Sequence, residues 1–430
     1  MEKRRPKSMY KKAAGERDLR IVVWPMKETK TVSVLVFVGL GSRYETKDLV
    51  GITHFLEHML GKGTRKRPDA LSIASEIDAV GGEFNGFTGA EYTLFYVKLP
   101  ADKVLLAVDV LSDIICNSRL DEKHIELEKG VILQEINHLL DTPSQYVLEL
   151  YHSLLYGDHP LGWDIVTSRE ALPQLNREKL ANLWRNCYTP DNMVVAVAGK
   201  IDPDKVISSV RNHFGNATGK KRTTWIPVKE SQTNPAFKAL PRKTDQTHIC
   251  LGVRTFISVL HPDRYTLEVL NTILGGCMSS RLFIKIREEM GLVYSVGSGI
   301  QTLLDTGSLS VEAGTDGSKV GEVIGAILGE FHRLRESLLN PDELQRAKNY
   351  VKGKLIMGLE NSEGLAYFLG KQELLQGRIR TVEEIMKEIE KVSLEDVRRV
   401  SENIFQEKNL NLALLGSFDG KLSFERLLRL

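Results

Sequence analysis

The sequence predicts an α+β protein of two homologous domains, each a mostly antiparallel sheet covered by helices. Three observations predict this class. Apolar runs of strand length alternate with amphipathic helical stretches along the 430 residues. The same order of elements returns about 214 residues later in the chain. Strand runs also follow one another directly at 83–88 and 92–99, which favours antiparallel pairing through a short connection.

The first half of the chain sets the order of elements. Its strand runs are rich in Val, Phe and Tyr, and glycines follow its first two helical stretches. Pro143 interrupts the later helical region, because proline cannot continue a helix interior. In order, the predicted elements are a strand at 32–38, a helix ending near Gly61, a helix at 69–80, strands at 83–88 and 92–99, helices at 101–116 and 121–140, and a closing strand at 193–198.

The second half repeats this order. Its matching elements are a strand at 248–253, a helix at 266–274, a strand at 307–313, a helix at 320–334 and a closing strand at 410–415. A shift of 214 residues places Leu56 on Leu270 and Leu60 on Leu274, so the apolar face of the first helix is kept. The repeat predicts that the chain arose by duplication of one domain.

The two copies differ in their polar residues, which fixes the predicted roles of the domains. The same shift places His54, Glu57 and His58 on Glu268, Asn271 and Thr272. The second copy therefore lacks these three side chains. We predict a zinc-binding catalytic domain at 1–215, a linker at 216–246 and a homologous domain without metal at 247–430. The linker contains several prolines and little apolar periodicity, which is typical of an extended connector.

His54-Phe55-Leu56-Glu57-His58 has the form H-x-x-E-H, the inverse of the common zinc-protease motif. On a helix, His54 and His58 are four residues apart and share one face, so both can bind one metal ion. Glu57 lies near that face and suits a general base that deprotonates a zinc-bound water. The alternative is two hydrogen-bonded histidines beside a surface glutamate. A hydrolytic zinc site needs three protein ligands and one open position, so a third ligand is expected elsewhere.

A downstream helix offers the third ligand. Glu128 and Glu135 are seven residues apart, almost two turns, and share a face with the apolar residues Val131, Ile132 and Ile136. Carboxylates on a partly buried stripe are costly unless they are paired or bind a metal. We assign Glu135 as the third ligand and Glu128 as a supporting acid; for Glu135 the alternative is a solvated helix carboxylate. One Zn²⁺ per chain is expected, although such a site also accepts manganese or cobalt.

The composition excludes several classes of protein. A hydrophobic content of 42% and a charged content of 27% are ordinary for a globular protein. A net charge of +2 gives no argument for nucleic-acid or membrane binding, and no apolar run is long enough to span a membrane. Basic residues gather at the N-terminus without a following apolar segment, so a secretory signal is not predicted, and a transit peptide is the alternative. These basic residues are Lys3, Arg4, Arg5, Lys7, Lys11 and Lys12.

The cysteines indicate a compartment. The four cysteines are far apart and contain no C-x-x-C pair, so they are expected to be reduced thiols of a cytoplasmic protein. A cysteine nucleophile is the weaker alternative, because none stands in a recognisable catalytic context. The four are Cys116, Cys187, Cys250 and Cys277.

These stretches resemble the pitrilysin, insulysin and mitochondrial processing peptidase family of zinc metallopeptidases. The resemblance runs from about residue 15 to about residue 416, and the length is similar to that of the short bacterial processing-protease-like subunits. Besides H-x-x-E-H and the helix with Glu128 and Glu135, it rests on Gly41-Ser42-Arg43-Tyr44-Glu45, on Gly81-Gly82-Glu83-Phe84-Asn85-Gly86-Phe87-Thr88, on His159-Pro160-Leu161-Gly162, on Ser280-Arg281-Leu282-Phe283 and on the stretch from Arg287 to Ser295.

The resemblance implies a peptide substrate and names residues that bind it. An extended peptide is expected to add as a strand along the edge that contains Gly82, Phe84 and Asn85. In related enzymes an Arg and a Tyr seven residues apart contact the substrate near the scissile bond. The resemblance therefore implies the same role for Arg287 and Tyr294. Both side chains can donate hydrogen bonds to an oxyanion. From the residues alone, Arg287 is an ordinary helix-surface arginine and Tyr294 a core tyrosine.

The resemblance also implies a clamshell homodimer, in which Arg287 and Tyr294 serve the zinc of the partner subunit. The predicted function is a zinc-dependent endopeptidase that hydrolyses peptides or unfolded and presequence segments. The alternatives are a catalytically silent scaffold, one subunit of a hetero-oligomeric processing peptidase, and a metal-binding protein without turnover. The intact ligand set argues against a scaffold, and Glu57 would be unnecessary in a purely structural site.

Overall fold

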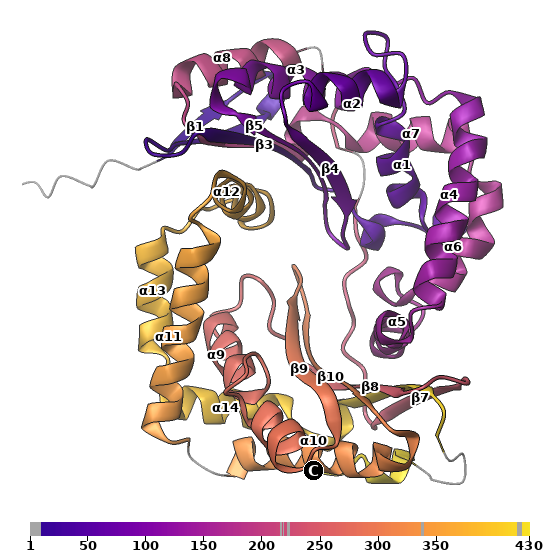
Figure 1. Cartoon of the computed structure of the whole chain (residues 1–430), viewed down its shortest axis with the longest axis vertical. Helices are drawn as coiled ribbons and strands as arrows, with labels where there is room; N and C mark the ends of the chain where they lie inside the picture. Colours follow the sequence, from indigo (N-terminus) through magenta and orange to yellow (C-terminus); the bar gives the residue numbers. More distant parts are fainter. Residues whose placement is uncertain (1–9, 216, 218, 222–223, 337–338, 419–423) are drawn as a thin grey trace, which may run out of the picture. The chain divides into compact units, whose positions relative to one another are not determined.

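The computed structural model describes residues 10–215, 217, 219–221, 224–336, 339–418 and 424–430. The basic residues Lys3, Arg4, Arg5 and Lys7 lie outside the described residues. The chain divides into two compact units, whose course along the sequence can be followed by colour in Figure 1. The first unit contains residues 1–134, 167–226 and 356–379, and the second contains 135–166, 227–355 and 380–430.

The first unit is built on a six-stranded sheet with the order β1-β2-β6-β3-β5-β4. Strands β2 and β6 are parallel, and the other described pairs are antiparallel. Strand β4 is an edge strand, so one side of its backbone has no neighbouring strand within the described part of the chain. The strands are β1 (Lys11–Ala14), β2 (Arg20–Pro25), β3 (Thr31–Val38), β4 (Glu83–Thr88), β5 (Thr93–Pro100) and β6 (Met193–Gly199).

Helices cover both faces of this first sheet. Helices α3 and α8 pack against one face, and α12 packs against the other (Figure 1). Helix α1 lies beside strand β4 and helix α7. The helices that lie wholly or mostly in this unit, or cross its boundary early in the chain, are α1 (Ile52–Leu60), α2 (Ala70–Asp78), α3 (Val104–Cys116), α4 (Glu122–Leu140), α6 (Ile165–Ala171), α7 (Arg177–Cys187), α8 (Pro203–Phe214) and α12 (Ser362–Gln376), and the last three residues of α11 (Pro341–Gly358) also belong to it.

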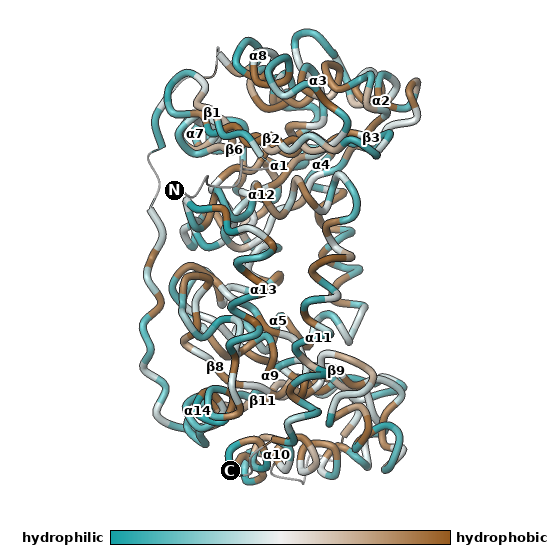
Figure 2. Tube along the Cα trace, turned by 90° about the vertical axis from the view of Figure 1, so that its left-hand side faces the viewer, coloured by the Kyte–Doolittle hydropathy of each residue, from teal (hydrophilic) through white to brown (hydrophobic). Residues whose placement is uncertain are grey.

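The second unit contains a five-stranded sheet with the order β7-β11-β8-β10-β9. Strands β7 and β11 are parallel, and the other described pairs are antiparallel. Amphipathic helices surround the sheet, as the alternation of hydrophilic and hydrophobic colours along α10 shows in Figure 2. The strands are β7 (Ala236–Pro241), β8 (Thr247–Arg254), β9 (Val293–Thr302), β10 (Gly307–Thr315) and β11 (Leu410–Gly416).

The helices of the second unit complete the match between the two halves. Helix α9 ends before Gly275 as α1 ends before Gly61, and each precedes its antiparallel edge hairpin. The predicted α+β class is confirmed, with two mixed sheets covered by helices. The helices here are α5 (Pro143–Tyr156), α9 (Arg264–Leu274), α10 (Val320–Glu336), α11 (Pro341–Gly358), α13 (Val382–Lys391) and α14 (Leu394–Ile404), with a π-helical segment at Phe283–Glu289.

One helix from the second half of the sequence completes the core of the first unit. Leu365, Ala366 and Leu369 of α12 lie in one buried cluster with Phe37 of β3. Gly370 permits this close packing, because a Cβ atom at that position would overlap the Phe37 ring. The residues of α12 therefore belong to the first unit, although they are more than 320 positions from β3 in the sequence.

A helix from the first half does the same for the second sheet. Tyr151 of α5 is almost fully buried in a cluster with Cys250 and Ala413, and its hydroxyl donates to Leu309 O at 3.3 Å. Gly252 leaves the space for that hydroxyl. The two halves thus exchange one helix each. We call this arrangement, α5 on the second sheet and α12 on the first sheet, the helix exchange.

The compact units consequently differ from the predicted ranges 1–215, 216–246 and 247–430. Residues 135–166 and 356–379 change sides because of the helix exchange, and α4, α6 and α11 run through the points of division. In the predicted linker, strand β7 joins the second sheet by pairing with β11. Residues 216, 218, 222 and 223 of that linker lie outside the described residues.

Two further observations concern the chain as a whole. Within the described residues, no helix combines the length and the apolar character that crossing a membrane requires. The four cysteines carry free thiols, of which Cys187 and Cys250 are buried and Cys116 and Cys277 are partly buried. Burial raises the pKa of the Cys116 thiol to about 12, so it is protonated at neutral pH.

Candidate metal centre

Helix α1 carries the H-x-x-E-H residues, and a buried carboxylate fixes its start. The Glu45 side chain accepts hydrogen bonds from Gly51 N at 2.8 Å and from Thr53 N at 2.9 Å. Glu45 thereby satisfies amide groups that have no partner within the helix. Burial raises the pKa of Glu45 to about 7, although these two hydrogen bonds act in the opposite direction. Phe55 and Leu56 bury the inner face of the helix, which leaves the H-x-x-E-H side chains on its outer face.

Two histidines on this outer face approach each other closely. The Nε2 atoms of His54 and His58 are 3.1 Å apart. Two nitrogens bound to one tetrahedral zinc at about 2.0 to 2.1 Å would be separated by roughly 3.3 Å, so this arrangement fits one shared ion. Burial, and to a smaller extent His58, lowers the pKa of His54 to about 4. His54 is therefore neutral at pH 7, as a metal ligand must be.

Glu135 completes a group that could hold a metal ion. One ligand atom from each of His54, His58 and Glu135 lies within 4.8 Å of the other two. Glu135 follows Gln134, where the contact-based division passes, but it belongs to the same continuous helix α4 as Glu128. Two imidazoles and one carboxylate form a typical ligand set for catalytic zinc. The residues present therefore fit the ion that the sequence predicts.

Glu128 orients one of these histidines. Its Oε2 lies 2.9 Å from His58 Nδ1, and its Oε1 accepts from Lys62 Nζ at 2.7 Å. Burial pushes the pKa of Glu128 upward, but the hydrogen bonds from Lys62 and His58 outweigh it, so the net pKa lies below its usual value. An ionised carboxylate can only accept, so His58 Nδ1 is the donor and its Nε2 keeps the lone pair that a metal needs.

The apolar stripe predicted around the two glutamates is only partly correct. Ile132 and Ile136 are buried, but Val131 is exposed. Glu128 is also buried, whereas Glu135 is exposed. The drift of about 20° over seven residues is too small to explain this difference. Glu128 instead contacts the side chains of His58 and Lys62 through its two carboxylate oxygens, and these contacts account for its burial.

Glu57 lies against the edge strand β4. Its Oε2 accepts from Thr88 Oγ1 at 3.2 Å, and a Cβ atom at Gly86 would come within 3.0 Å of its Oε1. Gly86 and Thr88 are two residues apart and therefore point to the same face of the strand. The carboxylate is thus held beside the open edge of the first sheet.

The three predicted peptide-binding residues all lie on or next to β4. Asn85 is exposed, and its side-chain oxygen accepts from Gly86 N at 2.8 Å. Phe84 is half-buried, on the same face of the strand as Gly86. At Gly82 the missing side chain has another use, since a Cβ atom there would come within 2.8 Å of Ile77 Cγ2. That glycine permits packing of α2 against the sheet.

A buried ion pair supports the loop that caps α1. Arg43 is fully buried, and its guanidinium donates to the buried carboxylate of Glu91. The same guanidinium lies 4.1 Å from the centre of the Trp225 ring. Arg43 N also donates to Ala90 O at 3.0 Å. These contacts hold the loop before α1, which contains Glu45, against the turn between β4 and β5. That turn follows Thr88, the hydrogen-bond partner of Glu57.

Arg287 and Tyr294 lie in the second unit. Arg287 belongs to the π-helical segment, a conformation that is frequent at functional sites. Its guanidinium lies 4.6 Å from the centre of the Phe283 ring and 5.7 Å from that of the Tyr294 ring. Tyr294 is 80% exposed, which excludes the core tyrosine considered from the residues alone. The structure thus pairs these two side chains at the surface of one unit.

The sequence reasoning missed Lys62, Glu45, Gly86 and Thr88 as neighbours of the site. Lys62 had no helical signal, because α1 ends at Leu60 and Lys62 lies in the turn that follows. Thr88 had a local signal, since alternation places it beside Gly86. Glu45 had no such signal, because helical spacing does not indicate a carboxylate that caps backbone amides six and eight residues later in the chain.

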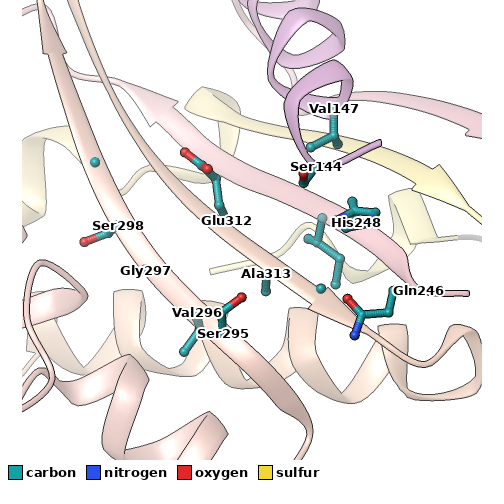
Figure 3. Close-up of a pocket in the computed structure, with 13 residues that line it drawn as sticks. Ser144, Val147, Gln246, His248, Ser295, Val296, Gly297, Ser298, Glu312 and Ala313 are labelled. Carbon is teal, nitrogen blue, oxygen red and sulfur yellow. The ribbon is translucent and has the colours of Figure 1, made fainter. Parts of the chain in front are cut away.

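A separate cavity of about 430 Å³ lies on the second sheet (Figure 3). Ser144 of α5, His248 of β8 and residues of β9 and β10, among them Glu312, line it. None of the predicted site residues lines this cavity.

Comparison with known proteins matches both halves of the chain. Residues 20–168 match the family model described as insulinase (peptidase family M16), and residues 174–351 match the model described as the peptidase M16 inactive domain. An uncharacterized zinc protease of Mycobacterium leprae is 37% identical over 96% of this chain and 93% of its own length. An uncharacterized zinc protease of Bacillus subtilis is 36% identical over 93% of this chain and 96% of its own length.

Solved structures share the fold. A protease from Helicobacter pylori superposes with a TM-score of 0.89 at 20% identity, covering 95% of this chain and 99% of that one. A chain of complex III from Candida albicans gives 0.79 at 19% identity, covering 97% of this chain and 98% of that one. The two family models, together with the identity to the bacterial zinc proteases over nearly the full length, establish that the chain belongs to the M16 (insulinase) family of peptidases.

Proposed function

We propose that this chain is a zinc-dependent endopeptidase with Glu57 as its general base. The observation that carries the proposal is the convergence of His54, His58 and Glu135 within 4.8 Å, with Glu57 on the same helix as the two histidines. A purely structural zinc site is closed by four protein ligands and needs no neighbouring base. Three ligands beside a positioned carboxylate support a hydrolytic site.

Each side chain has a chemical task in this proposal. A zinc ion held by the three ligands would lower the pKa of a coordinated water and polarise the carbonyl of the scissile bond. Glu57 accepts the proton that water loses as its oxygen bonds to the carbonyl carbon, and returns it to the amine as the C–N bond breaks. Thr88 holds the Glu57 carboxylate through its hydroxyl. Glu128 keeps His58 in the tautomer that can bind the metal.

The substrate in this proposal is an extended peptide on the open edge of β4. Backbone hydrogen bonds to an edge strand supply affinity that does not depend on sequence. Glu57 touches the same strand at Gly86 and Thr88, so a peptide added there would pass beside the base. Asn85 and Phe84 are the proposed contacts for its side chains.

The family resemblance supports a homodimer in which Arg287 and Tyr294 serve the partner's zinc. A mixture of a Glu57→Gln chain with an Arg287→Ala chain tests this idea, because each variant retains what the other lacks. Recovery of activity on mixing would support shared sites. If the mixture stays inactive although subunit exchange is demonstrated, the shared-site arrangement is wrong.

The decisive experiment measures zinc content and hydrolysis of a quenched peptide library for wild type, Glu57→Gln and Glu126→Gln. Glu126 is an exposed control on α4, and its carboxylate pairs with Lys129 Nζ at 2.8 Å. We expect one zinc in all three proteins, and chelator-sensitive cleavage in wild type and Glu126→Gln only. Zinc without cleavage in wild type would favour a scaffold or a subunit that needs a different partner.

A further inference from the structure

The helix exchange brings a tyrosine from the second half of the sequence to the edge strand of the first sheet. The hydroxyls of Tyr367 on α12 and Tyr92 are 2.5 Å apart. Tyr92 in turn packs edge-on against Phe87 of β4, with ring centres 5.7 Å apart and planes at 69°. Tyr367, Tyr92 and Phe87 therefore form a continuous chain of contacts, which we call the aromatic relay.

The core fixes the inner end of this relay. Phe37 is fully buried and lies 5.7 Å from the Tyr92 ring and 5.8 Å from the Tyr367 ring, measured between ring centres. Gly370 lets α12 lie directly on Phe37, as described above. Tyr92 is only 9% exposed, so water cannot easily replace the hydroxyl of Tyr367 as its partner. Both tyrosine rings therefore contact the same buried phenylalanine as well as each other.

The outer end of the relay lies on the edge strand along which the peptide is proposed to bind. Phe87 is 39% exposed, although it is a large apolar side chain on an edge strand. The register pairs Phe87 with Leu94 and Gly86 with Phe95, so Phe87 points to the face of α12 and Gly86 to the face of Glu57. A peptide strand on this edge would alternate in the same way. Every second side chain of the peptide would then point to the face of Phe87, and one of them would lie beside Phe87 itself.

We propose that Tyr367 is a specificity-determining positioning residue, which holds Phe87 through Tyr92 as the wall of an apolar subsite. This inference rests on the proposed peptidase function. The subsite would accept an apolar or aromatic side chain of the peptide, on the face of the strand opposite the general base. The second half of the sequence thereby shapes substrate choice in the first unit, through a residue that touches no substrate.

The test compares two quenched peptides that differ only in having Phe or Ala at the position that the wild-type cleavage profile identifies as apolar. Tyr367→Ala should reduce the Phe-to-Ala ratio of kcat/KM about tenfold, the lower end of what pocket changes produce. Tyr367→Phe and Tyr92→Phe should each give a smaller and equal reduction, and the double variant should be no worse than either, because both remove one shared hydrogen bond.

Controls separate positioning from a structural role. Tyr350→Ala, an exposed tyrosine on α11, should leave the ratio unchanged. A merely structural loss would lower kcat/KM for both peptides by the same factor and lower the Tm. If wild type cleaves and Tyr367→Ala keeps the wild-type ratio, the inference is wrong and the proposed function stands.

Binding provides a readout without turnover. In a Glu57→Gln background, labelled forms of the same two peptides should show the same shift in relative Kd when Tyr367 is replaced by Ala. If wild type does not cleave but this shift appears, the subsite exists and the endopeptidase proposal fails. If neither peptide binds to the zinc-loaded protein, both proposals are overturned.

Discussion

Replacing Glu128 with Gln should weaken zinc binding about ten- to a hundredfold while leaving the fold intact. Glu128 accepts from His58 Nδ1 at 2.9 Å and from Lys62 Nζ at 2.7 Å. Gln keeps one acceptor oxygen but replaces the other with an amide that donates. One of the two partners, an N–H of His58 or the ammonium of Lys62, would then face a donor.

The magnitude follows from burial and charge. Glu128 is only 5% exposed, so water cannot fully replace the lost acceptor. A hydrogen bond to a charged group contributes about 1.5 to 3 kcal/mol. If the whole of that contribution is needed to orient His58 for the metal, the free energy of zinc binding falls by about 1.5 to 3 kcal/mol, which corresponds to the expected factor of roughly ten to a hundred.

The assay is competition for zinc against a chelator of known affinity, at fixed pH and ionic strength. Glu126→Gln is the matched control, because Glu126 lies on the same helix but is exposed and bonds Lys129 instead. Urea unfolding of the zinc-free proteins reports whether the fold is affected. Equal zinc affinity for Glu128→Gln and Glu126→Gln would refute the role assigned to Glu128.

Three further predictions concern stability. Arg43→Ala should lower the free energy of unfolding by about 3 to 5 kcal/mol, because it leaves the buried carboxylate of Glu91 without its ion-pair partner. Lys129→Ala, which removes a surface ion pair with Glu126, should lower it by less than about 1 kcal/mol. Urea unfolding measures both values. Gly370→Ala should destabilise the protein by about 1 to 3 kcal/mol, because the added methyl group would overlap the Phe37 ring. Gly353→Ala, in a helix interior with open space around it, should stabilise the protein by about 0.5 to 1 kcal/mol. Equal Tm shifts for the two variants would contradict this reasoning. Burial raises the pKa of Glu45 to about 7 in the folded protein, so its contribution to the free energy of unfolding is fully present below a pH of about 4.5 and is lost as the pH rises through 7. The zinc-free wild type should therefore lose stability relative to Glu45→Gln between about pH 5 and pH 8. A difference that does not change with pH would contradict this reasoning.

Local spacing made much of the site predictable. His54 and His58 had to share a helical face because they are four residues apart, and the structure brings their Nε2 atoms to 3.1 Å. The group with Glu135 depended on a second helix, which the sequence indicated only through paired acids and the family resemblance. The structure therefore adds the distance, since one ligand atom of Glu135 lies within 4.8 Å of those of His54 and His58.

The repeat made the class of fold predictable, because strands and helices return in the same order and a glycine follows both α1 and α9. The helix exchange could not be predicted in this way. The apolar face of α12 carries no signal for which sheet it covers, and Gly370 explains its position only once Phe37 is known to be its neighbour. Contacts between residues that are hundreds of positions apart leave no periodic trace in one sequence.

The helix exchange also has a consequence for synthesis on the ribosome. The last strand of the first sheet, β6, ends at Gly199, but the helix that covers its open face ends only at Gln376. At about 5 to 20 residues per second, roughly 180 further residues take about 10 to 35 s to emerge. During that interval Phe37 and its neighbours have no cover from their own chain. A nascent chain stalled after residue 215 should therefore bind hydrophobic dyes or chaperones, and one stalled well beyond residue 380 should not.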